Sequence, residues 1–422
     1  MITCTSRADN SRPTRPEPEF TGPRSLLWLL LWTAVLYGAI AAAPPAAAQA
    51  QEDLPPASFD PYVMVGLTHD SNPLRVSSAA EIRGSDDESD LITTLEAGLD
   101  SYMAVSRQTL ILKGRVFRNQ YEEFDQIDHT GGNALGEWQW VWGSAWSGDL
   151  GYLFTRQLRD LANQSNAAKD MREESRFFGS VERGIGAGLR AVLAASSADI
   201  EFEENERLSL TRDTGQIGIY YESALDRSVG LEGKFTDGQY ELDSDRDYDE
   251  TSLQAVFDWP FSEKTRLAAK AGFTSRDFDV EERPDFSGVT GLVSLVRTNA
   301  KGGLLTVSIY REPSTLGDEI ANYAIVEGIT IAPEWPLGIA INLRLDLNYE
   351  RRDFRGVRDL TISDPDLESR EDDVVSGALW LDWDVSRIFR ISFGLAAGER
   401  SSTLPAEEYD FQRAQIQFRA GF

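Results

Sequence analysis

The sequence predicts an all-β protein: a single transmembrane antiparallel up-and-down β-barrel of about eighteen strands that follows a cleaved signal peptide. Three observations predict this fold: polar and apolar residues alternate, short turns alternate with long acidic connections, and tryptophans gather near the short turns. The alternation is clearest over 337–352, where Leu343 and Leu345 share one face and Asn342 and Arg344 share the other. A strand with one apolar and one charged face fits a wall between lipid and water.

The amino-terminal segment 1–50 has the form of a secretory signal peptide. Basic residues precede the apolar run at 25–43, and small residues end the segment. Cys4, the one cysteine of the chain, falls within it, so we expect no disulfide in the mature protein. Residues 51–58 are expected to be a short periplasmic leader. Residues 59–422 are expected to be one barrel domain, because no linker or change of composition divides them.

The strands follow from the alternating segments and the turn residues between them. Tight turns such as Gly143-Ser144 join them in pairs, and an even number places both chain ends on the turn side, which is periplasmic in such barrels. Glu327 shares the apolar face of its segment, so that strand is expected to be bulged or shifted. The expected strands are 62–68, 90–104, 107–121, 132–142, 145–158, 174–183, 189–203, 209–223, 228–240, 251–259, 264–278, 286–297, 304–311, 320–332, 337–352, 374–384, 388–400 and 408–422.

Aromatic residues are sorted to the two ends of these strands. Tyrosines at the long-loop ends are expected to form one membrane girdle, and tryptophans near the short turns the other. The chain ends on Phe422, which is similar to the terminal aromatic signal that barrels present to the assembly machinery. The tryptophans assigned to the girdle are Trp138, Trp142, Trp146, Trp259, Trp335 and Trp383.

One motif carries a family resemblance. The run DSNPLR at 70–75 follows the first strand, and a Ser/Asp-rich loop and a long alternating segment come after it. Over about 60–158 the chain resembles the EpsL-type outer-membrane barrels of exopolysaccharide operons, within the wider β-barrel porin group. The resemblance implies passage of secreted polysaccharide across the outer membrane, and it implies no catalytic residue. The motif residues are Asp70, Ser71, Asn72 and Arg75.

Basic residues are expected on the lumen face although the chain has a net charge of −28. Fixed cations on a pore wall attract anions, so we expect acidic solutes or anionic polysaccharide in the lumen. The alternative is that ladders of paired charges only fill and stiffen the barrel. The predicted lumen cations are Lys113, Arg115, Lys234, Lys270, Arg344 and Arg419.

Three functions stay open at this point. The first is a conduit for exopolysaccharide, and the second is a general or anion-preferring diffusion porin, for which we expect a long loop folded inward. The third is a lipid hydrolase, because His69 and Ser71 share a strand face and resemble the H-x-S-N segment of outer-membrane phospholipase A. In that phospholipase family, the serine is the nucleophile and the histidine is the general base. In this sequence Pro73 stands in place of the glycine that the family motif would have.

No enzymatic activity, cofactor or metal site is predicted. The acidic run at 243–250 begins like a calcium loop, but Tyr248 and Gln254 stand where glycine and glutamate are required. The acidic composition argues against nucleic-acid binding. We expect the protein in the outer membrane of a Gram-negative bacterium, with lipid, lipopolysaccharide and the barrel-assembly machinery as partners, and polysaccharide and other export proteins as further ones.

Overall fold

The alternating segments form antiparallel strands, each paired with the next along the chain. The structure, a computed structural model, describes residues 57–77, 89–164, 168–280, 283–315, 318, 321–357 and 370–422, so the predicted signal peptide lies outside the described residues. The strands are β1 (Ala57–Asp70), β2 (Asp90–Val105), β3 (Gln108–Tyr121), β4 (His129–Trp142), β5 (Trp146–Leu158), β6 (Met171–Gly186), β7 (Leu189–Phe202), β8 (Leu210–Glu222), β9 (Ser228–Tyr240), β10 (Tyr248–Ser262), β11 (Thr265–Phe278), β12 (Phe286–Thr298), β13 (Leu304–Ser314), β14 (Ala321–Pro336), β15 (Ile341–Val357), β16 (Glu371–Asp384), β17 (Phe389–Ser402) and β18 (Tyr409–Gly421).

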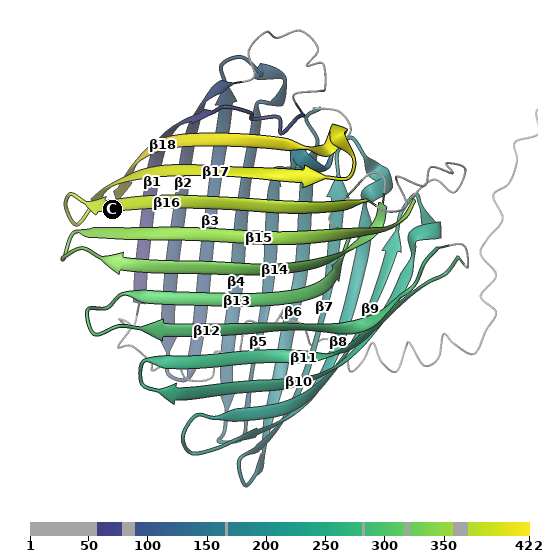
Figure 1. The fold of residues 1–422 in the computed structure, drawn as a ribbon. Helices are drawn as coiled ribbons and strands as arrows, with labels where there is room; N and C mark the ends of the chain where they lie inside the picture. Colours follow the sequence, from purple (N-terminus) through teal and green to yellow (C-terminus); the bar gives the residue numbers. More distant parts are fainter. Residues whose placement is uncertain are drawn as a thin grey trace, which may run out of the picture. The chain divides into compact units, whose positions relative to one another are not determined.

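The 18-stranded sheet closes on itself, because β18 pairs with β1 as well as with β17 (Figure 1). The closing register runs from Tyr62 opposite Gly421 to Asp70 opposite Arg413. Closure pairs the two strands that would otherwise be bare edges, as a bilayer requires. The predicted fold class, an antiparallel up-and-down barrel of eighteen strands, is therefore confirmed.

Many strand boundaries differ from the sequence prediction by a few residues, and those of β1 and β15 differ for identifiable reasons. β1 has 14 residues and begins at Ala57, inside the expected leader 51–58, because Pro61 is tolerated within the strand. Pro61 has no N–H to donate, and its carbonyl accepts a hydrogen bond from the backbone N–H of Phe422. β15 begins at Ile341, because Gly338, with φ of 107°, belongs to the preceding turn.

The expectation of a bulge in β14 is wrong. The pairing of β14 with β13 and with β15 keeps one register on both sides of Glu327. Glu327 lies directly opposite Arg311 on β13, and the two side chains form an ion pair on the outward face. The charge is compensated across the strands, so no change of register is needed to remove it from the apolar face.

The two faces of the wall are distinguished by a contact across the lumen. Arg400 of β17 reaches the backbone of the β5–β6 connection, so its face of the sheet is the inner one. Following the register from Arg400 places Arg344 inside and Leu345 and Leu347 outside. The charged face of each strand therefore lines the lumen, and the apolar face meets lipid, as in barrels of the Gram-negative outer membrane.

The expected tyrosine girdle is wrong for most of its members. Tyr310 points inward and donates a hydrogen bond to Glu350 at 2.9 Å, and Tyr240 is buried beneath Arg246. Tyr349, by contrast, projects from the outward face and donates to Asp373. The position of a residue along a strand sets its level in the membrane. Whether it faces the lumen or the lipid depends on the alternation of side chains along the strand.

The long connections pack inside the outer end of the barrel. Leu74, Phe124, Ile127 and Leu161, which come from three different connections, form one buried apolar cluster. Helical structure in the described residues is confined to five 3₁₀ turns in these connections. No helix in the described residues is long and apolar enough to cross a membrane. The outer mouth is therefore lined by packed loops and the other end by tight turns.

A pair of substitutions tests the assignment of the two faces. Leu347→Arg should destabilise the barrel in bilayers by about 2–4 kcal/mol, because Leu347 lies outward between the tryptophan end and the charged rim of β15. Asn348→Arg, one residue along and facing the lumen, should have little effect. Unfolding by urea in lipid vesicles measures both, and equal effects would contradict the assignment.

Candidate functional site: the lumen and its outer mouth

The predicted lumen cations all lie on the inner face, but most of them face a carboxylate. Lys270 lies 2.6 Å from Glu232, and Lys234 lies 3.1 Å from Glu250. Among the described residues, Lys113 alone of the six makes no ion pair. The remaining pairs are Arg344 with Asp382 at 2.9 Å, Arg419 with Asp100 at 3.7 Å, and Arg115 with Glu96 at 3.8 Å.

These pairs weaken the argument for a cationic wall. A carboxylate next to each cation cancels most of its field at the distance of a passing ion. Asp346 of β15 also faces the lumen, and it makes no ion pair within the described part of the chain. The alternative reading of paired charge ladders therefore describes the middle of the wall better than a cationic surface does.

The DSNPLR motif holds the seam where the barrel closes. Asp70 is fully buried and accepts hydrogen bonds from Arg75 at 2.9 and 3.0 Å and from Arg413 of β18 at 2.8 and 2.9 Å. Asn72 donates to the carbonyl of Asp410 at 3.0 Å. Arg75, with φ of 55°, stacks over the ring of Phe411 at 3.9 Å.

This arrangement, the seam clasp of Asp70, Asn72, Arg75 and Arg413, ties the first strand to the last. Its partners are backbone atoms and charges of the barrel itself, so its polar groups are satisfied internally. These contacts explain the DSNPLR motif as the residues that join β1 to β18 where the barrel closes.

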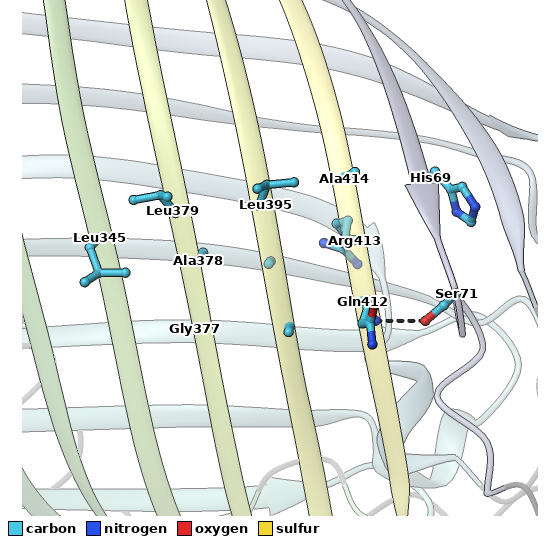
Figure 2. Close-up of a pocket in the computed structure, with 12 residues that line it drawn as sticks. His69, Ser71, Leu345, Gly377, Ala378, Leu379, Leu395, Gln412, Arg413 and Ala414 are labelled. Carbon is cyan, nitrogen blue, oxygen red and sulfur yellow. Dashed lines mark hydrogen bonds between the residues drawn. The ribbon is translucent and has the colours of Figure 1, made fainter.

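His69 and Ser71 do not form a catalytic pair in this structure. Both project from the outward face, beside a groove of about 680 Å³ that also touches Leu379 and Leu395. Figure 2 shows the Ser71 hydroxyl directed toward Gln412, whose backbone N–H donates to it at 2.8 Å. No hydrogen bond joins the two side chains, and a nucleophile needs such contact with its base. The structure gives the hydrolase alternative no support.

The predicted girdle tryptophans and the terminal residue lie near the short turns. Trp142, at the end of β4, is 76% exposed, and Trp335 and Trp383 lie opposite β15 residues at its turn end. Arg183 stacks over the ring of Trp146 at 4.8 Å. Phe422 is 75% exposed just beyond β18. Their role as an interfacial belt and an assembly signal stays a prediction.

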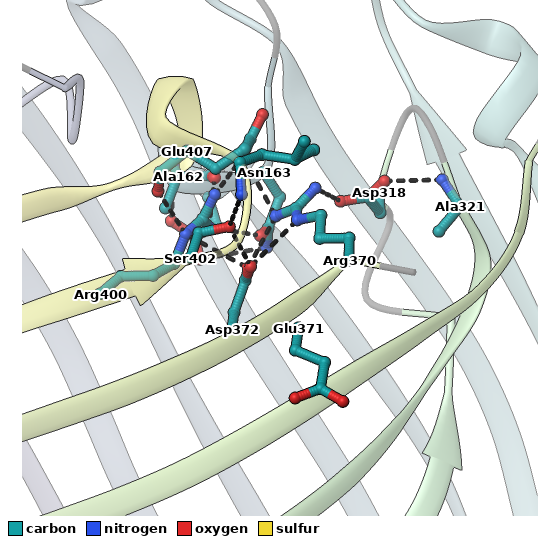
Figure 3. Close-up of polar contacts among 12 residues, drawn as sticks. Ala162, Asn163, Asp318, Ala321, Arg370, Glu371, Asp372, Arg400, Ser402 and Glu407 are labelled. Carbon is teal, nitrogen blue, oxygen red and sulfur yellow. Dashed lines mark hydrogen bonds and ion pairs between the residues drawn. The ribbon is translucent and has the colours of Figure 1, made fainter. Parts of the chain in front are cut away.

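A buried network of charges occupies the outer mouth (Figure 3). Arg370 is 1% exposed and lies 2.7 Å from Asp372, 3.1 Å from Asp318 and 3.1 Å from Glu407. Arg400 lies 3.4 Å from Asp372 and also pairs with Glu407. Burial raises the pKa of Glu407, although Arg370 and Arg400 oppose the shift, so this carboxyl keeps its proton to higher pH than an exposed glutamate.

Arg400 also fastens a distant loop. Its guanidinium donates to the carbonyl of Ala162 at 2.7 Å and to Asn163 at 3.4 Å, both in the β5–β6 connection (Figure 3). In the order of the sheet, β5 and β17 are six strands apart, through β4, β3, β2, β1 and β18. The β5–β6 connection therefore reaches across part of the mouth before it is held.

A second connection reaches inward on the other side. Arg246, between β9 and β10, donates to the carbonyls of Ala321 and Asn322 at 3.3 and 3.2 Å. These carbonyls begin β14, four strands beyond β10. Arg246 is 1% exposed, and its guanidinium stacks on the ring of Tyr240 at 4.6 Å. Two connections are therefore held inside the outer mouth by buried arginines.

Sequence reasoning missed these arginines. Strand parity indicates that Arg400 faces the lumen, but nothing in the sequence indicates that Ala162 lies within reach of it. Arg246 and Arg370 lie outside the strands, where alternation gives no information. Contacts between loops depend on the closed barrel, which brings distant segments to the same mouth.

Solved structures of outer-membrane channels have a similar fold. OpdK of Pseudomonas aeruginosa, bound to vanillate, aligns with a TM-score of 0.47 and 9% identity over 86% of this chain and 99% of that chain. OccAB3 of Acinetobacter baumannii aligns with a TM-score of 0.47 and 8% identity over 86% and 100%. A BenF-like porin of Pseudomonas fluorescens Pf-5 aligns with a TM-score of 0.47 and 9% identity over 87% and 99%. No protein-family model and no curated protein matches the sequence.

Proposed function

We propose that this outer-membrane barrel is a general diffusion channel for small solutes. The observation that carries the proposal is the attachment of two connections inside the outer mouth, where Arg400 holds the β5–β6 connection and the β9–β10 connection contacts β14. Inward loops reduce the opening of a barrel of eighteen strands, which would otherwise be wide. A hydrated, charged wall below them suits polar solutes.

A size cut-off in liposomes tests this function. Neutral sugars of increasing length should enter vesicles that contain the protein until a sharp limit is reached, as measured by swelling rates. Vesicles that contain a loop-deleted variant, without 161–163, should admit larger sugars. Free entry of long oligosaccharides into wild-type vesicles would contradict a channel for small solutes.

Export of exopolysaccharide remains a second proposal, supported by the resemblance over about 60–158 and its DSNPLR motif. The seam clasp accounts for that motif through barrel closure, which weakens the resemblance as evidence for polymer transport. Deletion of the gene should trap polymer in the periplasm if the barrel exports it. Unchanged polymer at the cell surface would leave the diffusion channel as the surviving proposal.

We expect weak ion selectivity of the channel, because five of the six predicted lumen cations face carboxylates. Reversal potentials across a planar bilayer under a salt gradient should lie near zero and approach it further as salt rises. Lys113→Gln removes an unpaired charge and should shift the potential toward cation preference.

The double variant Lys270→Gln/Glu232→Gln is the matched control for Lys113→Gln, because it removes an ion pair without changing net charge. It should leave the reversal potential unchanged. A strongly selective wild-type channel, of either sign, would mean that charges outside the paired wall control permeation.

A further inference from the structure

The outer mouth contains a buried cation that lacks a counter-charge. Arg246 is 1% exposed, and within the described part of the chain it makes no ion pair. Its Nη2 donates to two backbone carbonyls, while Nε and Nη1 have no hydrogen-bond acceptor among the residues that the structure describes. Burying a guanidinium is strongly unfavourable unless its charge and its donors find partners.

Two buried carboxylates in this region, Glu250 and Asp243, already pair with other cations. Glu250 accepts from Arg276 at 2.6 Å and from Lys234 at 3.1 Å. Asp243 lies 4.0 Å from Arg283, which also donates to the side chain of Asn322. These two buried carboxylates thus pair with two guanidinium groups and a lysine, and Arg246 is not among them.

Arg276 adds a second free donor to the same place. No described residue accepts a hydrogen bond from its Nη1, although its other nitrogens bind Glu250, and its guanidinium stacks on Tyr248 at 4.3 Å. Tyr240 and Tyr248 belong to one apolar cluster, and Arg246 and Arg276 lie over these two rings. Aromatic faces and apolar neighbours lower the local polarity, which strengthens the attraction of these cations for an anion.

From this geometry we propose that Arg246 and Arg276 form an oxyanion-binding site inside the outer mouth, which takes the carboxylate or phosphate group of a small anion. A guanidinium presents parallel N–H groups that match two oxygens of such a group. The suggested role of the site, to bind anionic solutes as they enter, rests on the proposed channel function. Anion binding itself does not. Most cations on the barrel wall face carboxylates, so we expect an anion to bind at the site of Arg246 and Arg276 instead.

Binding of acetate and of inorganic phosphate to the purified protein in detergent tests this site. Calorimetric titrations at constant ionic strength, set with sodium chloride, remove the effect of screening. Wild type should bind at least one of the two, and Arg246→Gln should bind it about tenfold or more weakly, as expected when a charged hydrogen-bonded partner is lost. Binding of acetate alone identifies a carboxylate site, and binding of phosphate identifies one that accepts phosphate esters.

Two further variants keep the test decisive. Arg344→Gln changes a paired arginine of the wall and should bind the anion like wild type. Arg246→Lys keeps the charge without the parallel donors and should be intermediate. Heat-modifiable migration in gels verifies that each variant is a folded barrel.

Folding itself gives an independent readout. Arg246→Gln also removes the hydrogen bonds to Ala321 and Asn322, so the readout is the change in stability on adding the anion: added anion should raise the stability of wild type to urea and leave that of Arg246→Gln unchanged. Equal binding by wild type and Arg246→Gln, or no binding by wild type, would overturn the site. Liposome swelling tests the channel separately, so either proposal can fail without the other.

Discussion

Replacing Asp70 by alanine is expected to destabilise the closed barrel by about 3 kcal/mol, the largest effect of any single change at the seam. The Asp70 carboxylate is fully buried and is shared by Arg75 and Arg413, so its loss leaves two guanidinium groups without their acceptor. We place the effect at the low end for a buried charge, because Arg413 is 38% exposed and water takes up part of its charge.

Urea unfolding in lipid vesicles measures this effect, and Asp100→Ala is its control. Asp100 is 50% exposed and lies 3.7 Å from Arg419, so the loss of this pair should cost less than about 1 kcal/mol. Asp70→Asn should fall between the two, because it keeps an acceptor but not the charge. If Asp70→Ala were as stable as Asp100→Ala, the clasp would not hold the seam.

Arg400→Gln is expected to cost about 3–5 kcal/mol and to widen the outer mouth. The change leaves Asp372, which is fully buried, and Glu407 with less positive charge, and it releases the carbonyl of Ala162. The β5–β6 connection then loses its attachment to β17. Single-channel recordings should therefore have larger mean conductance and more frequent transitions between current levels.

Arg390→Gln is the matched control for Arg400→Gln on the same strand and face. Arg390 and its partner Asp384 are each 47% exposed at the turn end, so their pair should contribute less than about 1 kcal/mol. Its conductance should be close to that of wild type. If Arg400→Gln lost stability without any change in current, the buried network would stabilise the barrel but would not control the opening of the outer mouth.

Local patterns along the chain are enough to predict the barrel. Alternation such as Leu343 to Leu347 on 337–352 specifies a strand with unlike faces, and short turns specify antiparallel neighbours. These signals are local, since each depends on residues within a few positions of one another. The inner placement of Lys113 and Arg344 followed from the same parity.

The contacts of those inner residues depend on the folded, closed barrel. Parity placed Arg344 and Lys270 in the lumen, but their neutralisation by Asp382 and Glu232 depends on register between strands. The hold of Arg400 on Ala162 joins residues 238 positions apart, which no pattern along the chain encodes. Such contacts exist because closure of the sheet brings remote loops to one mouth, where buried charges must find whichever partners the fold supplies.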